Sequence, residues 1–238
     1  AVIGDTVRAK IMKAKKNYGY GRLEEILTPS PDRVEPECQF ARQCGGCQLQ
    51  ALSYEKQLEF KTSKVRGHLE RIGGFTDLPM EEILGMEQPF HYRNKAQFPV
   101  GRSKDGRIIT GFYAGRTHNI IENRDCALGV PQNKEVLDRV IAHMEKFHIQ
   151  PYDEITGRGL VRHVLIRYGF FTDEMMVCLI INGEKLPGEE ALVESLREIP
   201  QTTSVMVNVN KKRNNVILGE KVRLLWGQPY ITDKIGEI

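Results

Sequence analysis

Three cysteines within ten residues constrain this chain more than any other feature of its sequence. Residues 38–47 read CQFARQCGGC, which places Cys38, Cys44 and Cys47 in the spacing C-x5-C-x2-C. In a reducing compartment neighbouring thiols do not persist as disulfides, so three of them together have little use unless they bind something. The spacing therefore predicts a metal or cluster site.

A centre of this kind calls for a fourth ligand, and two further cysteines are candidates. Cys126 lies in the polar, turn-rich stretch NRDCALGVPQ, where a thiolate can reach a metal centre. Cys178 lies in the apolar run MMVCLII, where a small buried side chain is the better explanation.

The spacing favours an iron–sulfur cluster over zinc without excluding zinc. Plant-type ferredoxins use C-x4-C-x2-C with a remote fourth cysteine, which differs from this pattern by one residue in the first gap. Structural zinc sites more often use two separated pairs of ligands, and the sequence holds no second pair. A third interpretation takes Cys44 and Cys47 as a thioredoxin-like redox pair, but it leaves Cys38 without a role.

Basic residues are unevenly distributed along the chain. The formal net charge is only +3, yet residues 1–22 hold six lysines and arginines against one acid, and residues 93–118 again hold six against one. A local excess of this kind suits a polyanionic partner, since each neutralised phosphate releases counterions. A solvated basic surface is the alternative explanation.

The first third of the chain predicts half of a small barrel, a stiff linker and a helix. Alternating residues over 1–16 and the run 22–27 predict two strands joined by a turn that carries Tyr18 and Tyr20, whose rings are suited to stacking on bases. Prolines then lead into the cysteines. The apolar spacing over 52–73 predicts a helix that holds the cysteine loop against the core.

The rest of the chain alternates strands and helices, which predicts an α+β sandwich. Strands are expected at 91–100 and 107–113, joined at Asp105-Gly106, and at 117–122, which leads to Cys126. This hairpin is expected to gather Arg93, Lys95, Arg107 and Arg116 beside the cluster. The later expected elements are helices at 132–148 and 188–198, strands at 161–171 and 174–182, a hairpin of 203–210 with 214–218, and a strand at 221–226.

Several function classes find no support in the sequence. No glycine-rich strand-to-helix turn, phosphate-binding loop or metalloprotease motif is present. The apolar runs are too short to cross a bilayer and no secretory signal is visible, so we expect a soluble cytoplasmic protein without a membrane partner.

With these residues in view, the chain resembles the iron–sulfur branch of the RNA uracil-5-methyltransferases that act on ribosomal RNA. The motifs that carry the resemblance are SPDRVEPEC at 30–38, CGGCQLQ at 44–50, YEKQLEFK at 54–61, YRNKAQFPV at 92–100, GFY at 111–113 and RHVLIR at 162–167. The resemblance implies a TRAM RNA-binding barrel, a central domain with a [4Fe–4S] cluster and a domain that binds S-adenosylmethionine. Carried over by position, the cluster ligands are Cys38, Cys44, Cys47 and Cys126.

The resemblance also implies a division of the chain. Residues 1–28 correspond to the last part of the TRAM barrel, with an OB-like fold, 29–51 to the linker and cysteine loop, and 52–238 to the central α+β domain. The family forms 5-methyluridine by adding a cysteine thiolate to C6 of uracil and removing the C5 proton with a carboxylate. No catalytic or S-adenosylmethionine-binding residue is assigned in this chain, so we expect it not to methylate by itself.

The expected partner is large-subunit ribosomal RNA, with no protein partner predicted. The residues expected to contact it are Arg93, Lys95, Arg107, Arg116, Lys15, Lys16, Tyr18 and Arg162. Two alternatives belong to other classes: a non-catalytic nucleic-acid-binding module with a structural zinc site, and an electron-transfer protein.

Overall fold

The computed structural model describes residues 1–115 and 117–237 and divides the chain into two compact units. The first unit contains residues 1–42 and 47–89, and the second contains residues 43–46 and 90–238. The expected boundary between 51 and 52 does not coincide with this division. Backbone contacts of Leu52 with Arg33 and of Ser53 with Asp32 tie the second half of the first unit to the linker.

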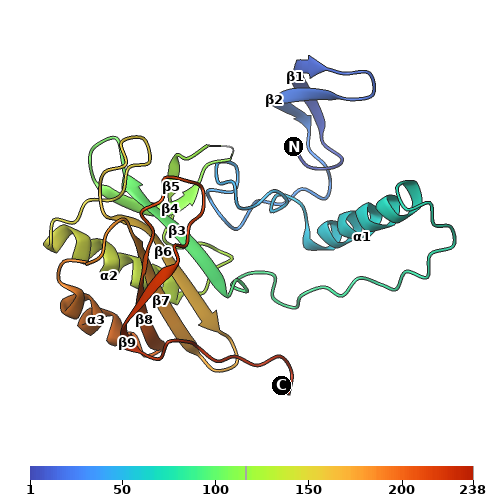
Figure 1. Cartoon of the computed structure of the whole chain (residues 1–238). Helices are drawn as coiled ribbons and strands as arrows, with labels where there is room; N and C mark the ends of the chain where they lie inside the picture. Colours follow the sequence, from blue (N-terminus) through green and yellow to red (C-terminus); the bar gives the residue numbers. More distant parts are fainter. Residues whose placement is uncertain (116, 238) are drawn as a thin grey trace. The chain divides into compact units, whose positions relative to one another are not determined.

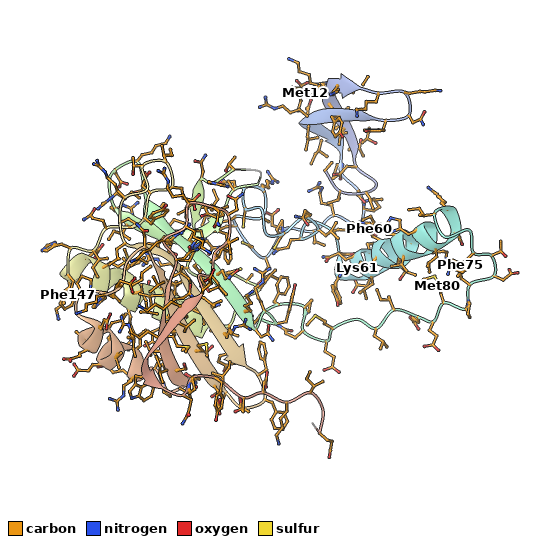
Figure 2. The ribbon with its side chains drawn as sticks, viewed as in Figure 1. Met12, Phe60, Lys61, Phe75, Met80 and Phe147 are labelled. Carbon is orange, nitrogen blue, oxygen red and sulfur yellow. The ribbon has the colours of Figure 1, made fainter. Side chains whose placement is uncertain are left out.

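The first unit begins with the antiparallel hairpin of β1 (Thr6–Ala14) and β2 (Gly19–Thr28), where two strands are expected. Its apolar side chains lie open to solvent: Met12, labelled in Figure 2, is 61% exposed and Ile11 66%. An ordinary hairpin buries one face against further strands. Within the described part of this unit no further strand supplies that face, so a complete barrel is not seen here.

A buried ion pair fastens this hairpin to the proline-rich linker. The carboxylate of Asp5 accepts hydrogen bonds from the Arg33 guanidinium and from the backbone N–H groups of Ser30 and Val2. These donors, with Arg33 contributing most, hold the pKa of Asp5 well below its usual range. The start of the chain is thereby fixed relative to the segment that leads to Cys38.

Helix α1 (Tyr54–Arg71) forms where a helix is expected, but its apolar stripe is not packed in a core. None of its residues is buried in the described structure, and Val65 is 51% exposed. That this helix holds the cysteine loop against the core stays a prediction. The Tyr54 hydroxyl of this helix accepts a hydrogen bond from the backbone N–H of Met86 at 2.7 Å.

The second unit is built on a seven-stranded sheet with the order β5-β4-β3-β6-β7-β8-β9 (Figure 1). Neighbouring strands run antiparallel except β7 and β8, which are parallel because α3 crosses between them. The strands are β3 (Lys95–Arg102), β4 (Ile108–Tyr113), β5 (Ile120–Glu122), β6 (Val161–Gly169), β7 (Glu174–Ile181), β8 (Thr202–Val209) and β9 (Lys221–Gly227).

Helices α2 (Gln132–Lys146) and α3 (Glu189–Arg197) lie together on one face of this sheet (Figure 1). The α2 side chains Val136, Val140 and Met144 recur at every fourth position and are each at most 1% exposed. Each such side chain contributes about 1.5–3 kcal/mol by burial, so this layer holds the sheet rigid. No helix in the described part of the chain has the length and apolar character that a bilayer crossing requires.

The expected strand at 214–218 is wrong, because asparagine side chains shape that segment as a loop. The Asn208 side-chain amide donates to the carbonyl of Gly219 and accepts from its N–H, and the Asn210 amide donates to the carbonyls of Val216 and Ile217. With these groups satisfied by side chains, β8 pairs with β9 instead.

The strand register also corrects the expected cluster of basic residues. Arg102 pairs with Ile108, so Arg107 lies at the hairpin turn, whereas Lys95 begins β3 and pairs with Arg167. Seven residues of strand separate the two ends, or about 24 Å. Lys95 and Arg107 therefore cannot belong to one local group beside Arg93.

Candidate functional site

Two of the four predicted ligands, Cys38 and Cys47, lie in the first unit and share a contact with Gln50. The backbone N–H of Cys38 donates to Gln50 Oε1, and Gln50 Nε2 donates to Cys47 Sγ, both at 3.2 Å. One amide side chain thus links both cysteines. An N–H donor directed at sulfur is also the contact that stabilises a thiolate ligand.

The other two predicted ligands lie in the second unit. Cys44 pairs with Ala114 at the end of β4, and the N–H of Gly45 donates to the carbonyl of Tyr113 at 3.0 Å. Cys44 Sγ accepts from the N–H of Gly46 at 3.4 Å. Cys126 begins a turn whose backbone pairs with that of residues 91–93, so Arg93 lies beside the turn that carries Cys126.

The donor chemistry fits a thiolate-ligated centre, but the geometry does not display one. Sulfur atoms of two cysteines accept N–H hydrogen bonds, and all four cysteines are partly exposed. Across the described residues, however, no group of three or more His, Cys, Asp or Glu side chains is placed to hold a metal ion. The four-cysteine centre therefore stays a prediction.

Cys178 has the buried, unreactive setting that its sequence context indicates. It lies on β7, only 4% exposed, and burial raises the pKa of its thiol to about 12. A thiol with such a pKa is protonated at neutral pH and is neither a nucleophile nor a metal ligand.

The tip of the β1–β2 hairpin carries the basic and aromatic residues predicted there. The Lys15 ammonium lies 5.4 Å from the centre of the Tyr18 ring, whose edge faces Tyr20 at 5.7 Å. Tyr18 is 55% exposed, and Lys16 is exposed beside it. Lys15, Lys16, Tyr18 and Tyr20 thus present positive charge and aromatic rings to solvent.

The other predicted RNA contacts have different settings. Arg93 lies 5.9 Å from the centre of the Phe112 ring, and Lys95 is exposed. Arg107 forms ion pairs with Asp105 and Glu122, which neutralise much of its charge. Arg116 lies outside the described residues.

Arg162 is buried, although the sequence suggested an RNA contact. It is 4% exposed, and its Nη1 donates to the carbonyls of Asn210 at 3.0 Å and Lys212 at 2.9 Å. Its guanidinium lies 4.5 Å from the centre of the Tyr152 ring. Next to it, burial and then the Arg162 charge lower the pKa of His163 to about 4.

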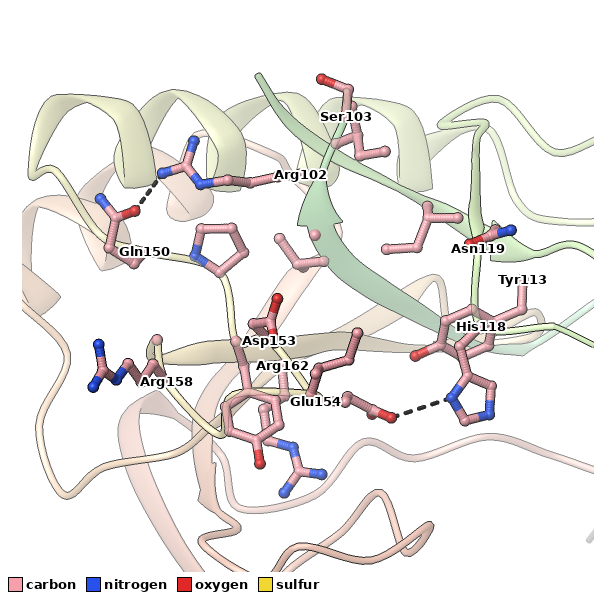
Figure 3. Close-up of a pocket in the computed structure, with 18 of the residues that line it drawn as sticks. Arg102, Ser103, Tyr113, His118, Asn119, Gln150, Asp153, Glu154, Arg158 and Arg162 are labelled. Atoms are coloured by element: carbon pink, nitrogen blue, oxygen red, sulfur yellow. Dashed lines mark hydrogen bonds and ion pairs between the residues drawn. The ribbon is translucent and has the colours of Figure 1, made fainter. Parts of the chain in front are cut away.

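A cavity among the described residues lies between the β3–β5 end of the sheet and the 150–162 segment (Figure 3). Its volume is about 920 Å³. Figure 3 shows Tyr113 and His118 on one wall and Asp153, Glu154 and Arg158 on the other. Sequence reasoning missed this cavity, because its walls are far apart in sequence and meet only through the β3–β6 pairing.

Aromatic rings and an ion pair dominate one side of this cavity. The rings of Tyr113 and His118 lie 5.4 Å apart with a tilt of 33°. His118 Nδ1 lies 3.3 Å from a Glu154 carboxylate oxygen, drawn as a dashed line in Figure 3. Burial, with a smaller contribution from Glu154, raises the pKa of the Tyr113 hydroxyl to about 12, so that it is a hydrogen-bond donor at neutral pH.

Comparison with known proteins identifies relatives along the whole chain. No family model matches it. An uncharacterized RNA methyltransferase of Halalkalibacterium halodurans is 46% identical over 239 residues, covering 100% of this chain and 52% of that relative. One of Clostridium tetani is 42% identical and covers 99% of this chain and 51% of the relative. The chain therefore spans about half the length of the curated relatives it matches.

A solved structure gives the same picture. The Pyrococcus abyssi tRNA (uracil-54, C5)-methyltransferase, in complex with S-adenosyl-L-homocysteine, matches with a TM-score of 0.68 and 25% identity. The match covers 97% of this chain and 50% of that chain. Over nearly all of its length, then, this chain is similar in sequence to about half the length of two RNA methyltransferases and in fold to half of a third.

Proposed function

We propose that this chain is the RNA-binding and cluster-bearing part of an S-adenosylmethionine-dependent RNA uracil-C5 methyltransferase. The observation that carries the proposal is the similarity over the whole chain to RNA methyltransferases about twice its length. The Pyrococcus abyssi protein, which acts on uracil, supports the choice of base. Its bound S-adenosyl-L-homocysteine supports S-adenosylmethionine as the methyl donor.

We propose Cys38, Cys44, Cys47 and Cys126 as the ligands of a [4Fe–4S] cluster. The N–H donors at Cys44 and Cys47 support this choice, since such hydrogen bonds are usual at cluster sulfurs. A bound cluster would supply a rigid cross-link between chain segments. The protein's own contribution is to orient the thiolates, through Gln50 in the first unit and the Tyr113 carbonyl in the second.

The proposed substrate is large-subunit ribosomal RNA in the cytoplasm. The exposed Lys15, Lys16 and Tyr18 of the hairpin combine a phosphate-neutralising charge with a ring that can stack on a base. Arg93 and Lys95 lie in the second unit, at the start of β3. The sequence contains no glycine-rich cofactor turn, and we propose that the 238-residue polypeptide binds RNA without methylating it.

Iron analysis and absorbance at about 400 nm of anaerobically purified protein test the cluster. Iron with visible absorbance is expected, and Cys44→Ser is expected to lose both. Cys178→Ser is the matched control and retains them, because that thiol lies in the core. Zinc without colour would favour the nucleic-acid-binding module instead.

Incubation with labelled S-adenosylmethionine and a ribosomal RNA fragment tests whether this polypeptide binds RNA without methylating it. Binding of the RNA without methyl transfer is the expected result. Specific methylation of a uridine by this polypeptide would refute the proposal that the chemistry lies elsewhere. If the double variant Lys15→Ala and Lys16→Ala bound RNA as tightly as the wild type, the proposal that the hairpin belongs to the RNA-binding surface would be contradicted.

A further inference from the structure

We propose that the cavity between β3–β5 and residues 150–162 binds one unpaired RNA base that carries an exocyclic amino group. This base is distinct from the uracil that is methylated, and the inference rests on the proposed function, that the chain binds RNA. It assigns a ligand to the pocket of Figure 3, which the cysteine motif and the basic stretches leave without a role.

The cavity has the size and the stacking surface that a nucleotide needs. Its volume of about 920 Å³ lies within the range of small-molecule sites. The Tyr113 ring is half-buried and packs against the ring of His163, with the centres 6.4 Å apart, while the Tyr113 backbone is held by the N–H of Gly45. His118 lies against Tyr113, and its side chain is 69% exposed. A base can therefore stack on an aromatic pair of which one member is already held.

Carboxylates in the lining determine which bases are favoured. Glu154 lines the cavity with its side chain 41% exposed, and its contact with His118 is long, at 3.3 Å. A carboxylate accepts hydrogen bonds from an exocyclic amino group of adenine, cytosine or guanine. Uracil has no amino group, and two carbonyl oxygens flank its single N–H, so the carboxylate binds it less favourably than an amino-bearing base. The cavity thus selects against the base that the proposed enzyme modifies.

Two exposed cations line the same cavity and can neutralise phosphates of a bound RNA strand. The side chains of Lys104 and Arg158 line the cavity and are exposed. Neither has a side-chain ion pair or hydrogen bond within residues 1–115 and 117–237. Arg102, by contrast, is engaged with Gln150 and with the carbonyl of Gly106. Uncommitted cations beside a stacking surface are the arrangement used for single-stranded nucleic acid.

Fluorescence anisotropy with short labelled RNA strands tests the inference. The strands are an oligouridine and the same oligouridine with one central adenosine or cytidine. The wild-type chain is expected to bind the substituted strands about 10-fold more tightly than the all-uridine strand. His118→Ala is expected to weaken binding of the substituted strands by at least about 5-fold, since a stacking partner is lost.

Glu154→Gln provides the sharpest variant, because the amide can both donate and accept. It is expected to bind the all-uridine strand as tightly as the adenosine strand. Glu190→Gln, an exposed change on α3, is the matched control and retains the preference. If Glu154→Gln still prefers the adenosine strand, or if the wild type shows no preference between the strands, the inference about the cavity is overturned while the proposed function stands. Failure to bind any strand or a ribosomal RNA fragment overturns the proposed function and the inference together.

Discussion

Replacing Arg162 by alanine tests how the cavity wall is held. The guanidinium is buried, and its Nη1 bridges the carbonyls of Asn210 and Lys212, which anchor the loop after β8. Arg162→Ala removes both hydrogen bonds and the contact with the Tyr152 ring. It also leaves the carbonyl of the buried Asn210 without this donor.

The structure sets the size of the effect. Two charge-assisted hydrogen bonds contribute about 1.5–3 kcal/mol each. The cation–π contact adds about 0.5–2 kcal/mol. Against this, the variant no longer buries a charge, which returns several kcal/mol. We therefore expect the free energy of unfolding of the second unit to fall by about 2–4 kcal/mol.

Urea unfolding followed by circular dichroism measures this loss. With a slope of about 2 kcal/mol per molar urea, the midpoint is expected to fall by about 1–2 M. Arg158→Ala, an exposed arginine of the same segment, is the control and is expected to change the free energy by less than about 0.5 kcal/mol. An Arg162→Ala midpoint that matches this control would refute the structural role of the guanidinium.

Three further predictions follow from single residues. The pKa of His163 is about 4 in the folded chain and about 6.5 in the unfolded chain, so on acidification the unfolded chain binds the proton first. The free energy of unfolding is therefore expected to fall by about 3 kcal/mol between pH 6.5 and pH 4. In His163→Gln the urea midpoint should depend less on pH over this range. Mass spectrometry after alkylation at neutral pH should find Cys178 unmodified, and rapid labelling would contradict its burial. Arg33→Ala should raise the pKa of Asp5 and speed proteolysis of the hairpin; an unchanged digestion rate would show that the ion pair is dispensable.

Elements with a strong local pattern were predictable from the sequence. The helix expected at 132–148 forms as α2 over residues 132–146, because its apolar side chains repeat with the helical period. The turn at Asp105-Gly106 forms as expected, with Gly106 in the left-handed region at φ 86°. The expected strands at 161–171 and 174–182 form as β6 and β7.

Features that depend on distant contacts were not predictable. The segment 214–218 ends in the apolar run VIL, which suits a strand, yet the side chains of Asn208 and Asn210 hold it as a loop. The grouping of Arg107 with Lys95 was wrong for a different reason, because the expected turn at Asp105-Gly106 already places the two at opposite ends of the hairpin. Tyr113 and Glu154 have no local signal, since only the pairing of β3 with β6 brings their segments together.

The end of β4 contacts both the cysteine loop and the cavity, because Tyr113 accepts a hydrogen bond from Gly45 and also lines the cavity. One side of this short stretch anchors the backbone next to Cys44, and the other presents the ring that lines the cavity. A change in the backbone beside Cys44 is therefore expected to reach the cavity through Tyr113, although the two lie far apart in the sequence.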